Sequence, residues 1–188
     1  MGEDDKKKSS IVFAGKIGEV IHTVQPDGRV FEKFSRPPGT RLIIVSSENK
    51  ILISKEFREE TGNFDLRLPG GKVCDTLEEY NKLRENSADI LEAAKAGAIK
   101  EAREEAGIIV NDLELVTIAN AGATVEWDLY YFLVKDYELH KDGQDLEEGE
   151  EISIVWMSID EIKKAIELGQ MQEWRSVGVL LGLIFTRF

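Results

Sequence analysis

Three glutamates in one short segment are of the residue type that binds hard metal ions. Glu101, Glu104 and Glu105 stand at positions i, i+3 and i+4 in the run KEAREEAGI, residues 100–108. If this run is helical, the spacing puts the three carboxylates on one face. Like charges one turn apart cost an isolated helix roughly 0.2–0.5 kcal/mol, and a divalent cation would reverse that cost. The alternative interpretation is a solvated helix face, with Lys100 and Glu104 as an ordinary surface pair.

The segments around the glutamates predict a helix with a sharp turn on either side. Residues 89–106 are rich in alanine and glutamate, and Glu92 follows Asp89 by three residues, as in a capping box. Gly107 suits the position that ends a helix. Ahead of the helix, Pro69-Gly70-Gly71 must turn the backbone after a short β-rich run. The sequence therefore predicts a helix that presents its carboxylates beside a glycine-rich turn.

These features together resemble the Nudix box, whose pattern is G-x5-E-x7-R-E-U-x-E-E-x-G-U, where U is an aliphatic residue. Gly71 matches the opening glycine, and Glu92 lies eight residues before Lys100, as the first glutamate should. The remaining matches are Glu101, Glu104, Glu105, Gly107 and Ile108. The resemblance implies an α/β Nudix fold: a mixed β-sheet sandwiched between helices, with additional N-terminal β-strands.

The chain departs from this pattern at three points. Glu92 lies 21 residues after Gly71, where the pattern has six, so about fifteen residues are inserted. Lys100 replaces the usual arginine, which keeps the charge but loses the planar fork that binds carboxylates bidentately. Ala102 is smaller than the usual aliphatic residue. The insertion puts the role of Glu92 in doubt and leaves the three clustered glutamates intact.

The insertion predicts an extra helix at about residues 73–91, beside the site. We expect it to act as a specificity element at the mouth of the site, with Tyr80 placed to stack on a base or a ribose. The alternative is a structural role, in which Leu77, Tyr80 and Leu83 pack against the domain; their spacing fits that equally well.

The resemblance implies roles for the matched positions. Glu101 and Glu105, with Glu104 as a further ligand, would bind the metal together with the carbonyl oxygen of Gly70. Mg²⁺ is the expected cofactor, with Mn²⁺ as the alternative. The metals would polarise the phosphoryl oxygens and lower the pKa of a bound water that attacks phosphorus, which makes Glu101 one of the expected catalytic residues.

A catalytic base is expected from the acidic loop at residues 141–151. In the resembling family this base comes from a loop late in the chain, and alignment on the following strand favours Glu150, then Glu148. An acidic loop that is merely solvated is the alternative.

The resemblance extends to most of the chain and is greatest for the ADP-ribose pyrophosphatases. Arg58, in the run KEFRE, occupies the place of a substrate-contacting arginine, and we group Arg41 with it as substrate-binding. A surface charge is the alternative for Arg58. In that group the N-terminal strands and the last helix build a homodimer. We expect the same here, because the run VGVLLGLIF at 177–185 is apolar on all sides.

The predicted reaction is hydrolysis of a nucleoside diphosphate linked to another group, most simply ADP-ribose or a related nucleotide sugar. Arg67 stands before Leu-Pro-Gly-Gly, where the pyrophosphatases carry a glutamate, so a Nudix pyrophosphatase for a different nucleotide is one alternative. A non-catalytic Nudix-fold module that senses a nucleotide is the other. An isomerase on the same scaffold is disfavoured because no His/Cys pair accompanies the box.

Composition limits the classes of protein and partner. The chain has 188 residues, 42% of them hydrophobic, and a formal net charge of −12. A surface this acidic repels nucleic acid. No apolar run approaches the roughly 20 residues that a membrane-spanning helix needs. The single cysteine, Cys74, fits a reducing cytoplasm. A small molecule is therefore the expected partner, besides a second copy of the chain.

One domain at residues 11–188 is expected after a mobile tail at 1–10. N-terminal strands are predicted within 11–34, around the turn Pro26-Asp27-Gly28. The runs at 41–46 and 50–54 predict a hairpin. Further strands are predicted at 113–118, 126–134 and 152–157, and further helices at 76–84, 159–168 and about 174–185.

Overall fold

The computed structural model describes residues 8–59, 61–86 and 89–187. The strands are β1 (Lys8–Ala14), β2 (Glu19–Val24), β3 (Val30–Ser35), β4 (Gly39–Ile44), β5 (Ile51–Arg58), β6 (Asn63–Arg67), β7 (Ile108–Val110), β8 (Glu114–Ala119), β9 (Val125–Glu126), β10 (Leu129–Val134), β11 (Tyr137–Leu139) and β12 (Ile152–Met157). The helices are α1 (Leu77–Glu85), α2 (Ile90–Glu104), α3 (Ile159–Glu167) and α4 (Trp174–Arg187).

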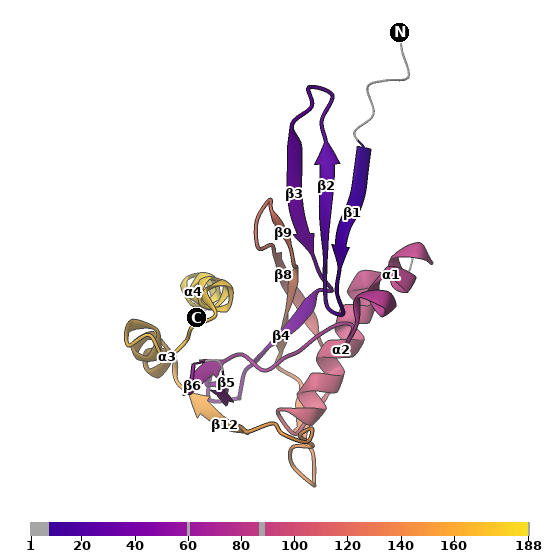
Figure 1. Ribbon diagram of the computed structural model, residues 1–188. Helices are drawn as coiled ribbons and strands as arrows, with labels where there is room; N and C mark the ends of the chain where they lie inside the picture. The colour runs from indigo at the N-terminus through magenta and orange to yellow at the C-terminus, as the bar shows by residue number, and fades with distance from the viewer. Residues whose placement is uncertain (1–7, 60, 87–88, 188) are drawn as a thin grey trace.

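Two three-stranded sheets make the centre of the molecule. In one, β10 pairs parallel with β4 and antiparallel with β8; in the other, β5 lies between β12 and β6. Figure 1 shows α2 on one side of β4, with α3 and α4 on the other side. The sheet is mixed and is covered by helices on both faces, as the sequence predicted.

The β4 strand is buried along its whole length, and its second half, Leu42-Ile43-Ile44, is a continuous apolar run because it is buried on both faces. Leu42 and Ile44 pack toward α2, whereas Ile43 packs in the cluster that contains α3 and α4. The contact surface of α2 is a row of fully buried alanines at four-residue spacing: Ala94, Ala98 and Ala102. Such small side chains let the helix approach the sheet closely. The glutamates of α2 lie on a different face of the helix.

The N-terminal strands form a separate sheet in the order β1-β2-β3-β9. Figure 1 shows this sheet projecting away from the rest of the fold, with α1 beside the base of β1. The tail was expected to cover residues 1–10, but β1 already begins at Lys8, so residues 8–10 belong to a strand. Residues 1–7, the rest of that expected tail, lie outside the described residues.

Most predicted elements are present, but the hairpin at 41–46 and 50–54 is wrong. β4 and β5 lie in different sheets and share only an isolated bridge between Val45 and Ile51. The physical reason is that the edge of β4 is already occupied. The N–H of Thr40 donates to the carbonyl of Gly71, and that of Leu42 donates to the carbonyl of Pro69. The glycine-rich turn takes the place of a paired strand.

One further expectation needs correction. The strand expected at 126–134 is split into β9 and β10, which belong to different sheets. The last helix buries Val177, Leu180 and Leu183 in the core, whereas Phe185 is 83% exposed, and its expected part in a dimer stays a prediction. Within the described ranges, no helix is long and apolar enough to cross a membrane.

Candidate active site

The carboxylates of the site come from the last turns of α2. The helix begins after Asp89, whose side chain accepts hydrogen bonds from the N–H groups of Leu91 and Glu92. The Glu92 carboxylate pairs with Lys95 at 2.6 Å, so it does not complete the expected capping box. Glu92 is also absent from the lining of the cavity described below. Glu92 therefore lies outside the cavity, in agreement with the doubt that the insertion raised about its role in the site.

The glycine-rich turn contacts two of the clustered glutamates. The N–H of Gly70 donates to Oε2 of Glu105 at 2.8 Å. A Cβ atom at Gly71 would lie 1.9 Å from Oε1 of Glu101. A side chain at position 71 would therefore displace the Glu101 carboxylate, which explains the need for glycine there.

Gly70 is required for a different reason. Its φ of 143° lies in the left-handed half of conformational space, which strains residues with a side chain. A Cβ atom there would lie 2.3 Å from the carbonyl oxygen of Thr40, on the adjacent strand. Gly70 thus holds the turn against β4, and Gly71 leaves room for the carboxylate.

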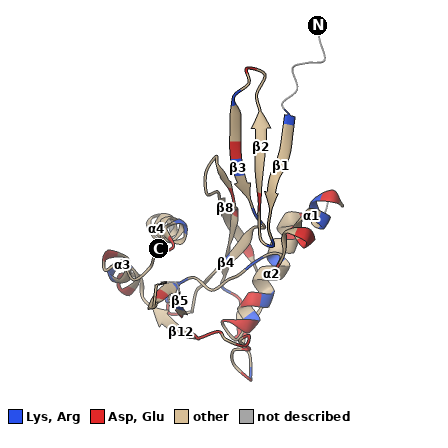
Figure 2. Cartoon of the chain, in the orientation of Figure 1, with Lys and Arg blue, Asp and Glu red and all other residues tan. Residues whose placement is uncertain are grey.

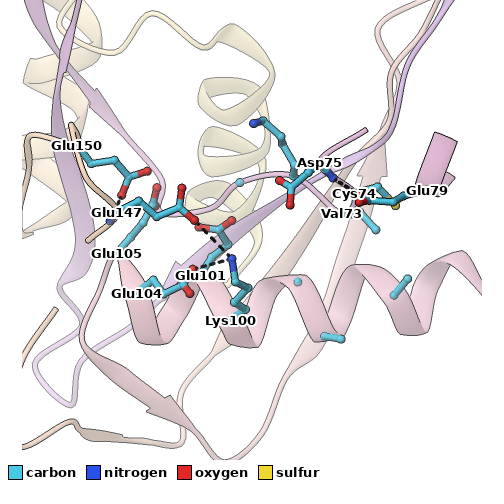
Figure 3. Close-up of a pocket in the computed structure, with 15 residues that line it drawn as sticks. Val73, Cys74, Asp75, Glu79, Lys100, Glu101, Glu104, Glu105, Glu147 and Glu150 are labelled. Atoms are coloured by element: carbon cyan, nitrogen blue, oxygen red, sulfur yellow. Dashed lines mark hydrogen bonds and ion pairs between the residues drawn. The ribbon is translucent and has the colours of Figure 1, made fainter. Parts of the chain in front are cut away.

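A cavity of about 500 Å³ lies between this turn, α2 and the acidic loop before β12. Figure 3 shows Glu101 and Glu104 reaching up from α2, Glu147 and Glu150 entering from one end, and Asp75 and Glu79 from the other. The lining residues are Gly71, Lys72, Val73, Cys74, Asp75, Glu79, Ala93, Ala96, Gly97, Lys100, Glu101, Glu104, Glu105, Glu147 and Glu150.

The electrostatics of the cavity favour a cation. Figure 2 shows acidic residues concentrated on the last turns of α2 and on the loop leading to β12. Burial, reinforced by the charges of Glu104 and Glu150, raises the pKa of Glu101 to about 7. Burial also raises the pKa of Glu105 to about 8, against the opposing hydrogen bond from Gly70. The acidic side chains that line the cavity outnumber its two basic side chains, Lys72 and Lys100, so the net charge of the lining is negative.

Lys100 ties the helix to the acidic loop. Its Nζ lies 3.1 Å from Glu104 and 3.8 Å from Glu147, so one ammonium group spans both elements. The hydrogen bond with Glu104 raises the pKa of Lys100. The lysine that replaces the pattern's arginine therefore still orients a glutamate of the cluster, as a point charge and without a fork.

The donor set fits a hard divalent cation. Carboxylate oxygens are the ligands that Mg²⁺ and Mn²⁺ prefer, and Glu101, Glu104 and Glu105 all line one cavity. Within the described part of the chain, no three acidic, histidine or cysteine side chains are drawn together around a common point. The Glu104 carboxylate pairs with Lys100, and the Glu105 carboxylate accepts a hydrogen bond from Gly70.

The acidic loop supplies one expected residue and one that was missed. Glu150 lines the cavity, and its Oε2 accepts a hydrogen bond of 3.0 Å from the N–H of Glu147. Glu148, the second choice for a base, is exposed and does not line the cavity. Glu147, which we did not expect, does. Nothing in the sequence distinguished it from its neighbours, because it becomes part of the site through Lys100.

Three residues expected to contact substrate lie outside this cavity. Arg41 is 6% exposed; its Nη1 donates to the Thr40 carbonyl and its Nε lies 3.5 Å from Glu173. It points to the face of β4 opposite α2. Arg58 donates to Glu56 at the end of β5.

Tyr80 is half-buried under the guanidinium group of Arg84, at 5.4 Å. Its pKa is raised by burial. Glu79, the preceding residue of the helix, lines the cavity, whereas Tyr80 does not. The substrate contacts predicted for these three residues remain untested predictions.

Comparison with known proteins decides the family. The NUDIX domain model matches residues 35–176, well over half of the chain. The chain belongs to the NUDIX domain family. The match begins at the last residue of β3, so most of the projecting N-terminal sheet lies outside it. The Nudix assignment made from the box is confirmed despite the insertion.

Individual relatives of this Nudix protein are distant. It is 21% identical over 180 residues to a methanol dehydrogenase activator of Bacillus methanolicus, covering 93% of this chain and 89% of the relative. It is 22% identical over 162 residues to an ADP-ribose pyrophosphatase of Bacillus subtilis strain 168, covering 83% and 79%. A crystal structure of an ADP compounds hydrolase has the same fold, with a TM-score of 0.65, 18% identity, and coverage of 96% and 94%.

Proposed function

We propose that this Nudix protein is a metal-dependent pyrophosphatase that cleaves the diphosphate of a nucleoside diphosphate joined to another group. The observation that carries the proposal is the convergence of Glu101, Glu104 and Glu105 with the Gly70–Gly71 turn in one cavity. Family membership and the likeness to an ADP-ribose pyrophosphatase support it. ADP-ribose, or a related nucleotide sugar, is the proposed substrate, and AMP and ribose 5-phosphate would be the products from ADP-ribose.

We assign different roles in the reaction to different residues of the cavity. Glu101, Glu104 and Glu105 would hold Mg²⁺ or Mn²⁺, together with the carbonyl oxygen of Gly70. The bound cations supply charge neutralisation at the phosphoryl oxygens and a water of lowered pKa. Glu150 is the proposed base that removes the proton of the attacking water, because it projects into the cavity from the loop opposite α2.

Two supporting residues fix this arrangement. Gly70 orients the Glu105 carboxylate through its N–H group, and Lys100 holds Glu104 toward the acidic loop. Glu147 shares Lys100 and donates its own N–H to Glu150. The loop that carries the proposed base is therefore attached to the helix that carries the proposed metal ligands.

A sensor that binds a nucleotide without cleaving it is the rival function. The enlarged box and Lys100 favour it, whereas the intact trio of glutamates favours catalysis. The substrate is the other open choice, because Arg67 precedes the glycine-rich turn and its Nη1 pairs with Glu56 at 3.1 Å. The single cysteine supports a cytoplasmic location, and the exposed apolar side chains of the N-terminal sheet support a homodimer.

A phosphate-release panel tests the proposal. The purified chain is incubated with ADP-ribose, other nucleoside diphosphate sugars, dinucleoside polyphosphates and nucleoside triphosphates, each with and without Mg²⁺ or Mn²⁺. We expect metal-dependent cleavage of one diphosphate class, with products identified by chromatography. Binding of a nucleotide without turnover under every metal condition would establish the sensor instead.

A further inference from the structure

The first part of the insertion, residues 72–79, forms a fixed wall of the cavity. The N–H of Val73 donates to the carbonyl of Pro38 at 3.0 Å, and that of Leu77 donates to the carbonyl of Lys16 at 2.9 Å. Cys74 and Leu77 are 7% and 6% exposed, so both anchor the segment by burial. A segment held at two points by backbone bonds and apolar contacts does not need to close over a ligand, because it is already in place.

This wall borders a part of the cavity that the metal-binding residues do not use. The insertion crosses α2 at Gly97, where a Cβ atom would lie 3.5 Å from the carbonyl oxygen of Lys72. Beyond Gly97 the floor of the cavity is made by Ala96 and Ala93. Small side chains leave room between helix and insertion. The cavity therefore continues from Glu101 toward the start of α2, and a group attached to the diphosphate has space there.

The wall presents carboxylates to that space. Oε2 of Glu79 accepts hydrogen bonds from the N–H groups of Asp75 and Thr76, at 2.9 and 3.2 Å, which fixes its position. Among the described residues the Asp75 carboxylate has no hydrogen bond or ion pair. Figure 3 shows it pointing back toward Glu101. An exposed, unpaired carboxylate accepts hydrogen bonds from hydroxyl groups and repels a phosphate.

We infer that Asp75 is a specificity determinant, selecting diphosphates whose second group is neutral and bears hydroxyls and rejecting those with a further phosphate at that position. This inference rests on the proposed pyrophosphatase function. It assigns the selectivity to a residue of the insertion, outside the Nudix box. The proposed metal ligands are Glu101, Glu104 and Glu105, and cations held there would neutralise the diphosphate. Asp75 is not among those ligands, and no ion pair joins it to Lys72, the basic residue of the insertion that lines the same cavity.

The test compares ADP-ribose with ATP, which carries a third phosphate. kcat/KM is measured for both nucleotides in the wild type, Asp75→Asn and Asp75→Glu. Asp75→Asn keeps the shape and removes the charge, so the ratio of kcat/KM for ATP to that for ADP-ribose should rise about tenfold. Asp75→Glu keeps the charge and should keep the ratio near that of the wild type.

Glu78→Gln is the matched control. Glu78 lies on α1, three residues after Asp75, and pairs with Lys82 at 2.6 Å, but it does not line the cavity. Its substitution removes one negative charge from the same insertion and should leave the ratio unchanged. An equal rise in Glu78→Gln would show that net charge, not Asp75, sets the ratio. An unchanged ratio in Asp75→Asn, with thermal unfolding like that of the wild type, would overturn the inference.

The proposed function and this inference fail in distinguishable ways. If the wild type hydrolyses neither nucleotide with Mg²⁺ or Mn²⁺, the proposed substrate is wrong. The ratio of the two Kd values, measured by calorimetry with Mg²⁺ present, then tests Asp75 in the same variants. A Kd ratio that Asp75→Asn shifts toward ATP by about tenfold supports the role, and an unshifted ratio refutes it.

Discussion

The N–H of Gly70 donates a hydrogen bond of 2.8 Å to the carboxylate of Glu105, linking two positions 35 residues apart in the chain. The bond joins the turn after β6 to the end of α2. It orients one oxygen of Glu105 toward the turn and leaves the other available to a ligand. The turn that leads into the Nudix box is thus in direct contact with the glutamate cluster at its end, even though the insertion separates them in the sequence.

Glu105→Gln should abolish most activity and preserve the fold. The amide oxygen can still accept the bond from Gly70, but the charge that a divalent cation needs is gone. We expect kcat to fall by at least about a hundredfold, with far-ultraviolet circular dichroism unchanged. Activity should likewise be lost in excess chelator and return with Mg²⁺. Unchanged turnover in the variant, or full activity in chelator, would contradict the metal site.

Substitution of Gly70 should lower stability, whereas substitution of Gly71 should lower activity. Gly70→Ala forces a side chain into the backbone of Thr40 at a positive φ, so it should lower the unfolding temperature. Such strain costs about 1–3 kcal/mol. Gly71→Ala meets the end of a flexible side chain, Glu101, and should keep the unfolding temperature while lowering kcat. Equal losses of unfolding temperature in both variants would show that Gly71 has a structural role only.

Within the acidic loop, Glu150 should matter more than Glu148. Both are exposed, but only Glu150 lines the cavity. Glu150→Gln should lower kcat by roughly 10²–10⁴-fold, the usual contribution of a general base, with little change in KM. Glu148→Gln should stay close to the wild type and serves as the control for loop charge. Comparable losses in the two variants would remove Glu150 from the role of base.

The metal-free protein should lose stability as pH rises. The folded-state pKa values of Glu101 and Glu105, about 7 and about 8, lie above the ordinary value of 4.5. The folded state therefore binds more protons than the unfolded state between pH 5 and 8, and unfolding becomes easier through that range. Each kcal/mol lost lowers Tm by roughly 2–4 °C for a chain of this size.

Thermal unfolding in chelator between pH 5 and 8 measures this effect. Glu105→Gln should flatten the decline, because the variant has no carboxyl group to deprotonate there. Saturating Mg²⁺ should flatten it in the wild type. A Tm that rises with pH in chelator would mean that these carboxylates are stabilised by ionisation, contrary to their burial.

The N-terminal sheet should mediate a homodimer. Ile11 and Phe31, 58% and 54% exposed, lie on the same face, since they pair with Ile21 and Thr23 on either side of β2. Light scattering should show a dimer at micromolar concentration, and Phe31→Asp should shift it to a monomer. Leu139→Asp, at a site 71% exposed on β11, is the control. A monomeric wild type would refute the prediction.

The sequence predicted the parts of this structure that local pattern determines. The glutamate spacing predicted a helix face, and the helices predicted at 76–84 and 159–168 are present as α1 and α3. What it could not predict depends on partners distant in the chain. The edge of β4 is taken by residues 69–71, and nothing in either segment announces that pairing. Arg41 alternates with Leu42 along β4, yet only the position of α4 decides that it meets Glu173.

The hydrogen bond from Leu77 to the carbonyl of Lys16 has a consequence beyond holding α1 in place. Lys16 lies in the turn between β1 and β2, at the base of the projecting sheet, and the insertion runs from there to the cavity. The N-terminal sheet and the segment that carries Asp75 are therefore joined by a backbone hydrogen bond, two residues after Asp75. The turn between β1 and β2 is thus part of the support for one edge of the cavity, although it lies outside the Nudix box.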